Sequence, residues 1–348
     1  MAIDITSQPV ASYFSYFYAK LSTIVGGALL QPLSLLLALV VFAVIIGVVV
    51  GVFAYLFGWM ERKVVARVQS RHGPTYVGKF GILQNLADIV KLLSKENIIP
   101  DNADKPLFLL ILPLVFAIFV IILGFLPLTG SFVGINTSWG LLVVFIALSF
   151  TPLLLFLAGW TSGNKFSSIS AQRSVMILVS YEIPLMLVVV SVAMLANGYG
   201  LGAIVAAQQS RWFVLAMPLG FVVFFMVMLA ELERSPFDLR EADNELIAGW
   251  LTDVGAPYFG LALFLDYTRV FVGTLLMALL FFGGWLGPAI VPGFVWLLLK
   301  VVALVLSIII IRATLVRMKI DRVLKVGWIY LMPLAVVNLL ISFILFVR

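Results

Sequence analysis

The stretch QPLSLLLALVVFAVIIGVVVGVFAYLFG, residues 31–58, contains no charged side chain and decides the fold class of this chain. A helix needs about 20 apolar residues to cross the roughly 30 Å hydrocarbon core of a bilayer. The rest of the chain has the same character, since 63% of all residues are hydrophobic and 11% are charged, with a mean hydropathy of +1.19. Water-soluble domains carry about 25% charged residues. We therefore expect an all-α polytopic membrane protein without a separate soluble domain.

Apolar stretches of similar length recur and predict about eight membrane spans. We place them at 31–58, 107–128, 140–160, 171–196, 212–232, 249–276, 293–311 and 327–346. Residues 1–30 mix polar and aromatic side chains and are expected to lie at the membrane interface, which leaves 31–348 as a single transmembrane domain. The amphipathic segment GILQNLADIVKLLSKE, residues 81–96, is too short and too charged to cross. We expect it to form a helix on the membrane surface or against a partner.

Basic residues are distributed unevenly over the connections between these spans. The odd-numbered connections carry many of them, whereas the even-numbered connections hold only Arg211. Because basic loops stay on the cytoplasmic side, we expect the odd connections inside and both termini outside. This placement accounts for the net charge of +6 without invoking nucleic acid as a partner.

The chain has no cysteine and one histidine, His72. Cysteine-bound iron–sulfur clusters and thiolate metal sites are therefore excluded. A haem or copper site made by the protein alone is not expected either, and we assign no catalytic residue and no metal ligand. The sequence contains no evident internal repeat, which argues against an inverted-repeat transporter.

Half of the 16 acidic residues lie between Glu231 and Asp266. A carboxylate at the bilayer centre costs about 2.5–3.5 kcal/mol on insertion scales, so this concentration indicates that protons, cations or a polar head group are handled there. Like charges so close together cannot all stay ionised, and raised carboxyl pKa values suit proton transfer. Two alternatives stay open: Glu241 and Asp243 could belong to a solvated loop, and Asp266 could form a structural ion pair with Arg269.

Glu182 lies inside the fourth predicted span, in RSVMILVSYEIPLMLVVV, residues 173–190. Counted from an inner start near 171, it reaches about 16 Å into the bilayer at 1.5 Å per residue. Pro184 removes an amide donor beside it, and irregular backbone at that depth is tolerated where it lines a wet cavity or is buried in protein. The alternative is a protonated Glu182 that is hydrogen-bonded to a neighbouring helix. Lys300 is expected either to snorkel to the outer face or to take part in the chemistry.

A basic segment, ERKVVARVQSRHGP, residues 61–74, follows the first span directly. The HGP sequence with Gly78 and Gly81 predicts a turn that returns the chain to the surface helix. Basic and amide groups at the inner interface would suit the oxygen-bearing head group of a lipid-soluble molecule.

Four segments together resemble a known family. They are ERKVVARVQSRHGPTYVGKFGILQNLADIVKLLSKE (61–96), SYEIP (180–184), ERSPFDLREADNELIAG (233–249) and FFGGWLGP (281–288). In this order they resemble the membrane protein known as the H subunit, or subunit 1, of complex I, the NADH–quinone oxidoreductase. The resemblance implies a subunit that binds no redox cofactor, forms the chamber in which quinone is reduced, and begins the acidic path that couples this reduction to proton translocation.

The resemblance also implies roles for particular side chains. We assign proton coupling to Glu182, Glu231, Glu233, Glu241, Asp243, Glu245, Asp253 and Asp266. We place near the quinone entrance or the junction with the electron-transfer arm Arg62, Gln69, Arg71, Asp88, Arg234 and Phe237. Positions 243, 253 and 266 carry Asp where many members carry Glu, and Glu233 is an additional acid. Because each Asp is one methylene shorter, a direct relay would need a water.

The implied partners are hydrophilic arm subunits that carry iron–sulfur clusters and flavin, small membrane subunits and antiporter-like subunits, with quinone as substrate and lipid around the spans. NADH, reduced deazaflavin, ferredoxin and hydrogen stay open as electron donors. Two alternative functions are the anchor and ion-coupling subunit of a membrane-bound hydrogenase or ferredoxin-linked complex without quinone, and a free-standing proton or cation transporter. A third is a purely structural anchor. We favour the plasma membrane of a prokaryote over an organellar inner membrane.

Overall fold

The computed structural model describes residues 15–19, 30–130, 132–240, 243–288 and 290–347, and every regular element in these ranges is helical. The long helices are α2 (Leu30–Val68), α4 (Lys105–Phe125), α5 (Gly140–Thr161), α6 (Lys165–Leu195), α11 (Ala256–Phe281), α12 (Gly293–Thr314) and α14 (Met332–Val347). The short elements are η1 (Lys79–Gly81), α3 (Gln84–Ser94), α7 (Leu201–Ala207), α8 (Phe213–Ala216), α9 (Pro218–Glu231), α10 (Asp243–Leu246), η2 (Gly249–Leu251), α13 (Ile320–Lys325) and η3 (Val326–Leu331).

Seven helices in the described part of the chain are long and apolar enough to cross a membrane. The last of them runs through α13, the π-helical η3 and α14 without interruption, over Ile320–Phe346. The predicted all-α, polytopic fold class is therefore confirmed. Most of the predicted interfacial segment 1–30 lies outside the described residues, and which end of the bundle faces the cytoplasm stays a prediction.

The predicted fifth span, 212–232, differs from a single membrane-crossing helix. Met217 has φ −135° and ψ 69°, and Pro218 then begins α9. Because proline has no amide hydrogen and fixes its own φ, it suits the first turn of a helix. The 14 residues of α9 rise about 21 Å at 1.5 Å per residue. The predicted span is thus divided into α8 and the short apolar helix α9.

Two other helices begin or end at residues that differ from the predicted span boundaries, and this changes which charged residues lie on them. α2 continues to Val68, about ten residues beyond the predicted span, so Glu61 and Arg62 lie on the helix itself. α11 begins only at Ala256, with Pro257 in its first turn. Asp253 therefore precedes α11, whereas the sequence pattern places it inside the sixth span.

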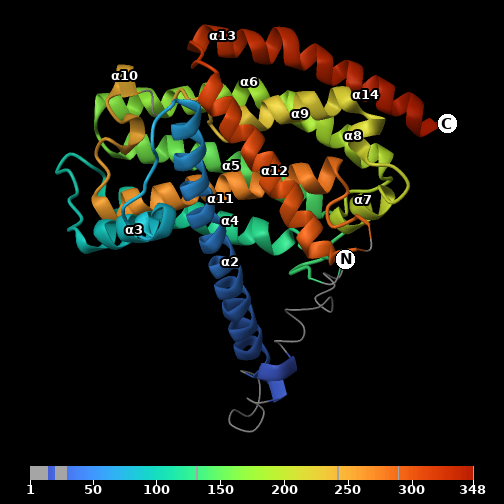
Figure 1. Ribbon diagram of the computed structural model, residues 1–348, viewed down its shortest axis with the longest axis horizontal. Helices are drawn as coiled ribbons and strands as arrows, with labels where there is room; N and C mark the ends of the chain where they lie inside the picture. Colours follow the sequence, from blue (N-terminus) through green and yellow to red (C-terminus); the bar gives the residue numbers. More distant parts are fainter. Residues whose placement is uncertain (1–14, 20–29, 131, 241–242, 289, 348) are drawn as a thin grey trace.

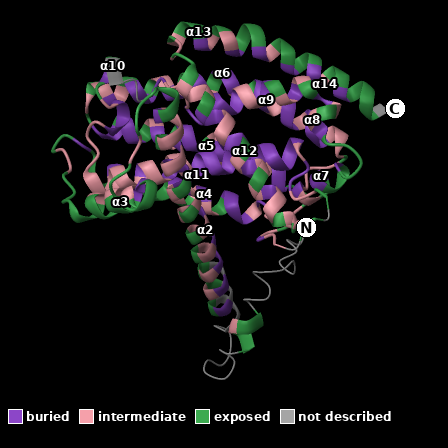
Figure 2. Ribbon diagram, in the orientation of Figure 1, coloured by how far each residue is buried: buried purple, intermediate pink, exposed green. Residues whose placement is uncertain are grey.

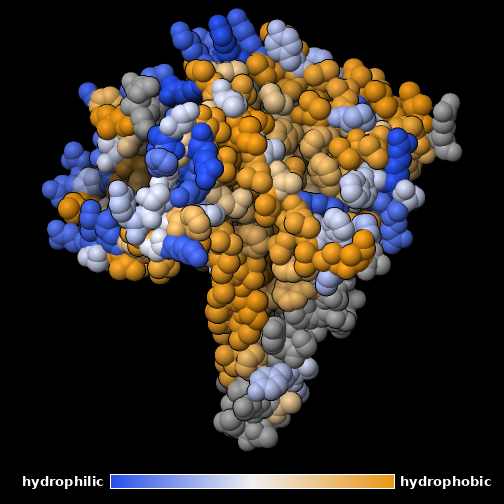
Figure 3. Space-filling view, in the orientation of Figure 1, coloured by the Kyte–Doolittle hydropathy of each residue, from blue (hydrophilic) through white to orange (hydrophobic). Residues whose placement is uncertain are grey.

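α11 is the most buried of the seven spanning helices and packs against α2, α4, α9 and α12. Figure 2 shows the buried residues concentrated in the middle of the bundle, with exposed residues on α3, α13 and α14. In Figure 1, α3 and α10 lie at one end of the bundle, and α7 and α8 lie at the other. Hydrophobic side chains cover much of α2 and α12, while hydrophilic ones gather around α3 and α13 (Figure 3).

The predicted surface helix is present as α3, Gln84–Ser94. Leu86, Val90 and Leu93 are exposed on one side of it. Its other side packs on α2 and α11. This packing positions the candidate functional site described below.

Candidate functional site

Three buried charged side chains and the partly buried Asp266 meet between the end of α9 and the middle of α11. This inner charge cluster consists of Glu233, Arg240, Asp266 and Arg269. The Glu233 carboxylate lies 2.8 Å from the Arg240 guanidinium and 3.0 Å from that of Arg269. Asp266 lies 3.2 Å from Arg240 and 3.9 Å from Arg269. The ion pair between Asp266 and Arg269 that the sequence left open is thus present, within a larger network of two acids and two arginines.

The backbone around the inner charge cluster is tightly constrained. Glu233 has a φ of 50°, a left-handed conformation that is uncommon for residues other than glycine. The Arg269 side chain donates to the Glu231 carbonyl at 2.5 Å, which satisfies an acceptor at the end of α9. Gly249 has a φ of 59°, and a Cβ there would stand 2.0 Å from the Arg240 carbonyl oxygen. Only glycine permits this close approach.

Burial and the two arginines act on Glu233 in opposite directions. Burial raises the pKa of its carboxyl group, but the charges of Arg240 and Arg269 outweigh this effect and bring the pKa below its ordinary value. Glu233 is therefore a carboxylate at neutral pH, and it stays one as long as both arginines are in place.

A second group of charges, the Glu61 cluster, joins α2, α11, α12 and the loop after α9. It consists of Glu61, Arg234, Tyr267 and Arg312. The Glu61 carboxylate, only 9% exposed, pairs with Arg312 and lies 3.3 Å from Arg234. Tyr267 is hydrogen-bonded to the same carboxylate, and the Arg234 guanidinium lies 5.5 Å from the centre of the Tyr267 ring.

Asp238 connects the two clusters electrostatically. Burial raises the pKa of its carboxyl group above the ordinary value, partly offset by the positive charges of Arg312 and Arg240 and reinforced by the negative charge of Glu233. These neighbours belong to both clusters. Sequence reasoning did not select Asp238, although it lies in the quoted ERSPFDL segment, because its burial depends on how the loop folds.

Glu182 lies on α6 and accepts a hydrogen bond from Ser149 of α5. This contact agrees with the alternative in which a neighbouring helix satisfies the carboxyl group. α6 continues as a helix through Pro184. Glu231, at the end of α9, is close enough to interact electrostatically with both Glu182 and Glu233, so it connects Glu182 of α6 with the inner charge cluster.

Two other predicted coupling acids, Glu245 and Asp253, have different partners. Glu245 sits on the surface between Arg173, at 2.6 Å, and Arg317. Its hydrogen bond with Arg173 is the main cause of a pKa below the ordinary value. Asp253 accepts hydrogen bonds from Asn164 and Ser167, each at 3.2 Å, and so ties the turn before α11 to the start of α6. Glu241 and the side chain of Asp243 lie outside the described part of the structure.

A largely apolar cavity of about 330 Å³ lies between α2, α3 and α11. The side chains that line it include Ala54, Tyr55, Arg62, Asn85, Asp88, Ile89, Leu92, Leu93, Leu261, Phe264 and Tyr267. We call it the α3 cavity. Arg62 and Asp88 form an ion pair of 2.6 Å within it. Partial burial raises the pKa of Asp88, but the hydrogen bonds from Arg62 and Gln84 bring it below its ordinary value.

A more polar cavity of about 540 Å³ adjoins the α3 cavity. The two share Arg62 and Tyr267 as lining residues. The polar cavity is also lined by Arg71 and by Glu61 and Arg312 of the Glu61 cluster. The apolar α3 cavity thus borders, at Arg62 and Tyr267, a polar cavity that is lined by members of the Glu61 cluster.

Three of the predicted junction residues, Gln69, Arg234 and Phe237, do not line these cavities. Gln69 is exposed and accepts a hydrogen bond of 2.8 Å from Arg71. Phe237 is fully buried and packs edge-on against Tyr181, with ring centres 5.3 Å apart. Arg62, Arg71 and Asp88 line the cavities, and Arg234 belongs to the Glu61 cluster. Among the described residues, no group of three or more His, Asp and Glu side chains could hold a metal ion.

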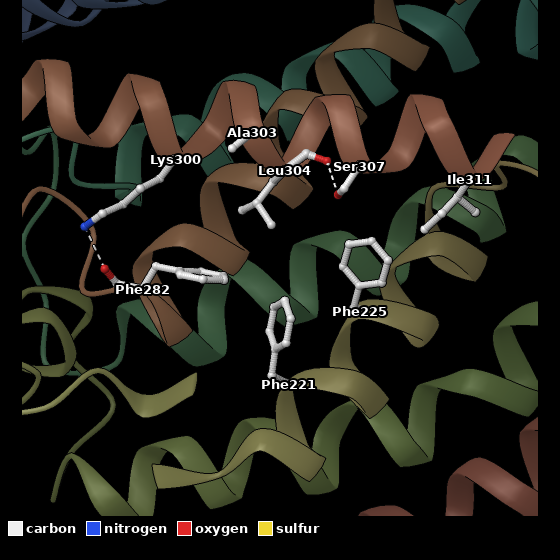
Figure 4. A pocket seen from close by; sticks show the side chains of 8 residues that line it. All are labelled: Phe221, Phe225, Phe282, Lys300, Ala303, Leu304, Ser307 and Ile311. Carbon is white, nitrogen blue, oxygen red and sulfur yellow. Dashed lines mark hydrogen bonds between the residues drawn. The ribbon is translucent and has the colours of Figure 1, made fainter. Parts of the chain in front are cut away.

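A second apolar cavity, of about 470 Å³, lies between α9, α12 and the end of α11. Phe221 and Phe225 project into it, whereas Lys300 extends away from them toward the Phe282 carbonyl (Figure 4). The Lys300 ammonium donates to the carbonyls of Phe282, Gly284 and Leu286 at 2.6–2.8 Å. A cation at the C-terminal end of a helix is favourable, and all three donors are used, so Lys300 stabilises the end of α11.

The fold and the site define a polytopic membrane protein in which an apolar cavity adjoins a polar cavity lined by charged side chains. A sequence model described as NADH dehydrogenase matches residues 40–343, and the chain belongs to this family. Its curated relatives are named as the H subunit of NADH-quinone oxidoreductase. The protein from Dehalococcoides mccartyi is 40% identical over 286 residues, 82% of this chain and 80% of the relative. That from Carboxydothermus hydrogenoformans is 37% identical over 287 residues, 82% of each chain. The resemblance noted in the four sequence segments is confirmed.

Proposed function

We propose that this chain is the membrane subunit of a proton-translocating quinone reductase. In this proposal it admits quinone from the bilayer and begins the path of acids that couples quinone reduction to proton translocation. The relatives, which are named as NADH-quinone oxidoreductase subunits, support the reaction class. The observation that carries the proposal is the α3 cavity, which shares Arg62 and Tyr267 with the polar cavity and so reaches the Glu61 cluster.

The composition of the α3 cavity suits a quinone. Its volume falls at the lower end of the range of about 300–1,000 Å³ that is typical of ligand pockets, which combine apolar walls with a few placed polar groups. The apolar side chains would receive the ring and the first part of the tail. Arg62 and Arg71 would then present donors to the carbonyl oxygens of the head group, which can only accept hydrogen bonds.

The acids behind the cavities supply a route for the coupling. Reduction changes the charge of the head group close to Arg312 and Arg234, which are neighbours of Asp238. Asp238 has a raised pKa, so a modest change of field alters its protonation. The change then acts on Glu233, Glu231 and Glu182 in turn. Glu241 and Asp243 stay in this proposal as predicted members of the path, while Glu245 and Asp253 act at its edge by holding the loops.

The proposal requires partners, because a chain without cysteine cannot supply the ligands of a cysteine-bound iron–sulfur cluster. Electrons would come from a hydrophilic arm with iron–sulfur clusters and flavin, and small membrane subunits and antiporter-like subunits would receive the coupling signal. The chain itself would contribute no redox cofactor. The bacterial sources of its relatives favour the plasma membrane of a prokaryote.

A photoreactive quinone with an azide on the ring tests the proposal on the assembled complex. We expect label on peptides that contain residues 51–62, 85–93 and 257–267, and we expect excess unlabelled quinone to remove it. Mass spectrometry of the copurified subunits identifies the electron-input arm. Label that excess quinone cannot displace, together with recovery of nickel–iron hydrogenase subunits or of an active lone chain, would contradict the proposal.

A further inference from the structure

Ser149 on α5 has two hydrogen-bond acceptors within reach of its single hydroxyl group. One is the Phe145 carbonyl of the same helix, at 2.9 Å, and the other is the Glu182 side chain of α6. A serine hydroxyl has one hydrogen and two lone pairs, so it donates to one acceptor at a time and can accept from a second group. The direction of the hydroxyl hydrogen therefore depends on whether Glu182 can itself donate.

The protonation state of Glu182 decides this direction. An ionised carboxylate only accepts hydrogen bonds, whereas a protonated carboxyl group also has an O–H donor. When Glu182 is ionised, Ser149 Oγ donates to it, and hydrogen bonds to charged groups are about twice as strong as neutral ones. When Glu182 is protonated, its O–H donates to Ser149 Oγ, and the Ser149 hydrogen turns to the Phe145 carbonyl. Each protonation state thus has a complete hydrogen-bond arrangement.

The turn of the hydroxyl leaves no group of α5 without a partner. Phe145 and Ser149 are four residues apart inside this helix, so the Phe145 carbonyl also accepts the helical hydrogen bond from the Ser149 amide. A carbonyl oxygen has two lone pairs, and the helical bond occupies one of them whichever way the hydroxyl points. The Phe145 carbonyl can therefore receive and release the hydroxyl without breaking the helix.

Ser149 is the one hydrogen-bond partner that the described part of the structure gives the Glu182 side chain. α5 and α14, which pack most extensively on α6, carry no charged residue, and α9 contributes the acid Glu231. α10, α13 and η3 also pack on α6, and their described titratable side chains are exposed: Glu245, Asp321, Arg322, Lys325 and Tyr330. A neutral hydroxyl group, and not a counter-charge, therefore meets the Glu182 carboxyl group.

We propose that Ser149 is a positioning residue for the coupling step at Glu182. This inference rests on the proposed function and deepens it. A proton that arrives stays on the Glu182 carboxyl oxygen and is held toward Ser149 Oγ, while the Ser149 hydrogen turns to Phe145. When that proton leaves, the hydroxyl turns back to the carboxylate. Ser149 keeps its own hydrogen throughout, so it stabilises both states of Glu182 and does not pass the proton on.

Infrared difference spectra of the assembled complex, recorded while quinone is reduced electrochemically, test this role. We expect a carboxyl C=O band that disappears in Glu182→Gln. In Ser149→Ala the same band should move to higher frequency, because the protonated carboxyl group loses its hydrogen-bond partner. Ser149→Thr keeps a hydroxyl that can bond residue i−4 and should leave the band in place.

The rate of proton translocation in proteoliposomes is the second readout. It should fall about tenfold in Ser149→Ala, the size of one hydrogen bond, and less than about twofold in Ser149→Thr. Ser191→Ala is the matched control, because the Ser191 hydroxyl donates to the Leu187 carbonyl at 2.8 Å. This is the same bond to residue i−4, without a carboxyl group among its described partners. Ser191→Ala should leave both the band and the rate unchanged.

Three results would overturn the inference while the proposed function stands. The first is a Glu182 band at the same frequency in Ser149→Ala as in the natural chain. The second is a fall in rate that Ser149→Thr does not restore, and the third is an equal fall in Ser191→Ala, since either would reflect helix packing alone. A natural chain without any Glu182 band would instead refute the coupling role of Glu182 in the proposed function, and this inference with it.

Discussion

Two acids in this molecule each lie between two arginines, yet they occupy opposite environments. Glu233, which is 8% exposed, lies between Arg240 and Arg269 at 2.8 and 3.0 Å. Glu245, whose side chain is 46% exposed, lies between Arg173 and Arg317. Breaking a buried ion pair by removing one partner costs about 3–5 kcal/mol, whereas an exposed pair contributes about 0–1 kcal/mol. The ion pairs of Glu233 are therefore needed for the stability of the fold, whereas the similarly arranged ion pairs of Glu245 contribute little to it.

The causes of the two low pKa values differ in the same way. At Glu233, burial acts against ionisation and the two arginines overcome it. At Glu245, the hydrogen bond with Arg173 is the main cause, and burial contributes less. Glu233 thus depends on its arginines to be a carboxylate, while Glu245 would be one in water in any case.

Arg269→Met gives the strongest test of this comparison. The substitution keeps an apolar stem of similar length but removes one partner of Glu233 and the donor to the Glu231 carbonyl. We expect the free energy of unfolding to fall by about 3–5 kcal/mol. Arg317→Met is the matched control at Glu245 and should change it by less than about 1 kcal/mol. Denaturation of the purified complex in nanodiscs measures both, and equal losses would show that burial does not separate the two acids.

Gly249→Ala tests whether the backbone fixes the inner charge cluster. The new Cβ would meet the Arg240 carbonyl, and alanine would have to adopt a φ of 59°. We expect a loss of about 1–3 kcal/mol, the usual range for such backbone strain. Gly202→Ala is the control, since Gly202 lies in the first turn of α7 and a Cβ there meets nothing within 4 Å. If Gly249→Ala destabilises the protein no more than Gly202→Ala does, the Arg240 backbone can shift to make room for the new Cβ.

Much of the fold is readable from the sequence because apolar length is a local property. Seven predicted spans have a matching long helix, and the broken fifth carries its own signal in Pro218. The positions of the acids along the chain can also be read from the sequence, but their ion-pair partners cannot. Arg234 and Arg312 lie 173 and 251 residues from Glu61 in the chain, and no local pattern links residues so far apart.

Glu182→Gln separates a coupling role from a structural role for the carboxyl group of Glu182. The amide still accepts the hydrogen bond from Ser149, so the free energy of unfolding should change by less than about 1 kcal/mol. Proton translocation should fall, because the amide cannot change its protonation. A pH-sensitive dye in proteoliposomes of the assembled complex measures proton uptake per quinone reduced. Unchanged uptake would favour the purely structural anchor.

Glu245→Gln has the smallest expected effect. It tests how the stabilisation from the exposed ion pairs of Glu245 depends on pH. The pKa of Glu245 lies below its ordinary value of 4.5, so the stabilisation from its ion pairs is complete above pH 4.5 and is lost as the pH falls through the lowered pKa. The natural chain and Glu245→Gln should therefore differ by less than about 1 kcal/mol at pH 7 and should converge in acid. Thermal unfolding in steps from pH 7 to pH 3 measures the difference, and added salt should reduce it because exposed charges are screened. A difference that salt leaves unchanged would place Glu245 with the buried acids, because only burial protects an ion pair from the surrounding electrolyte.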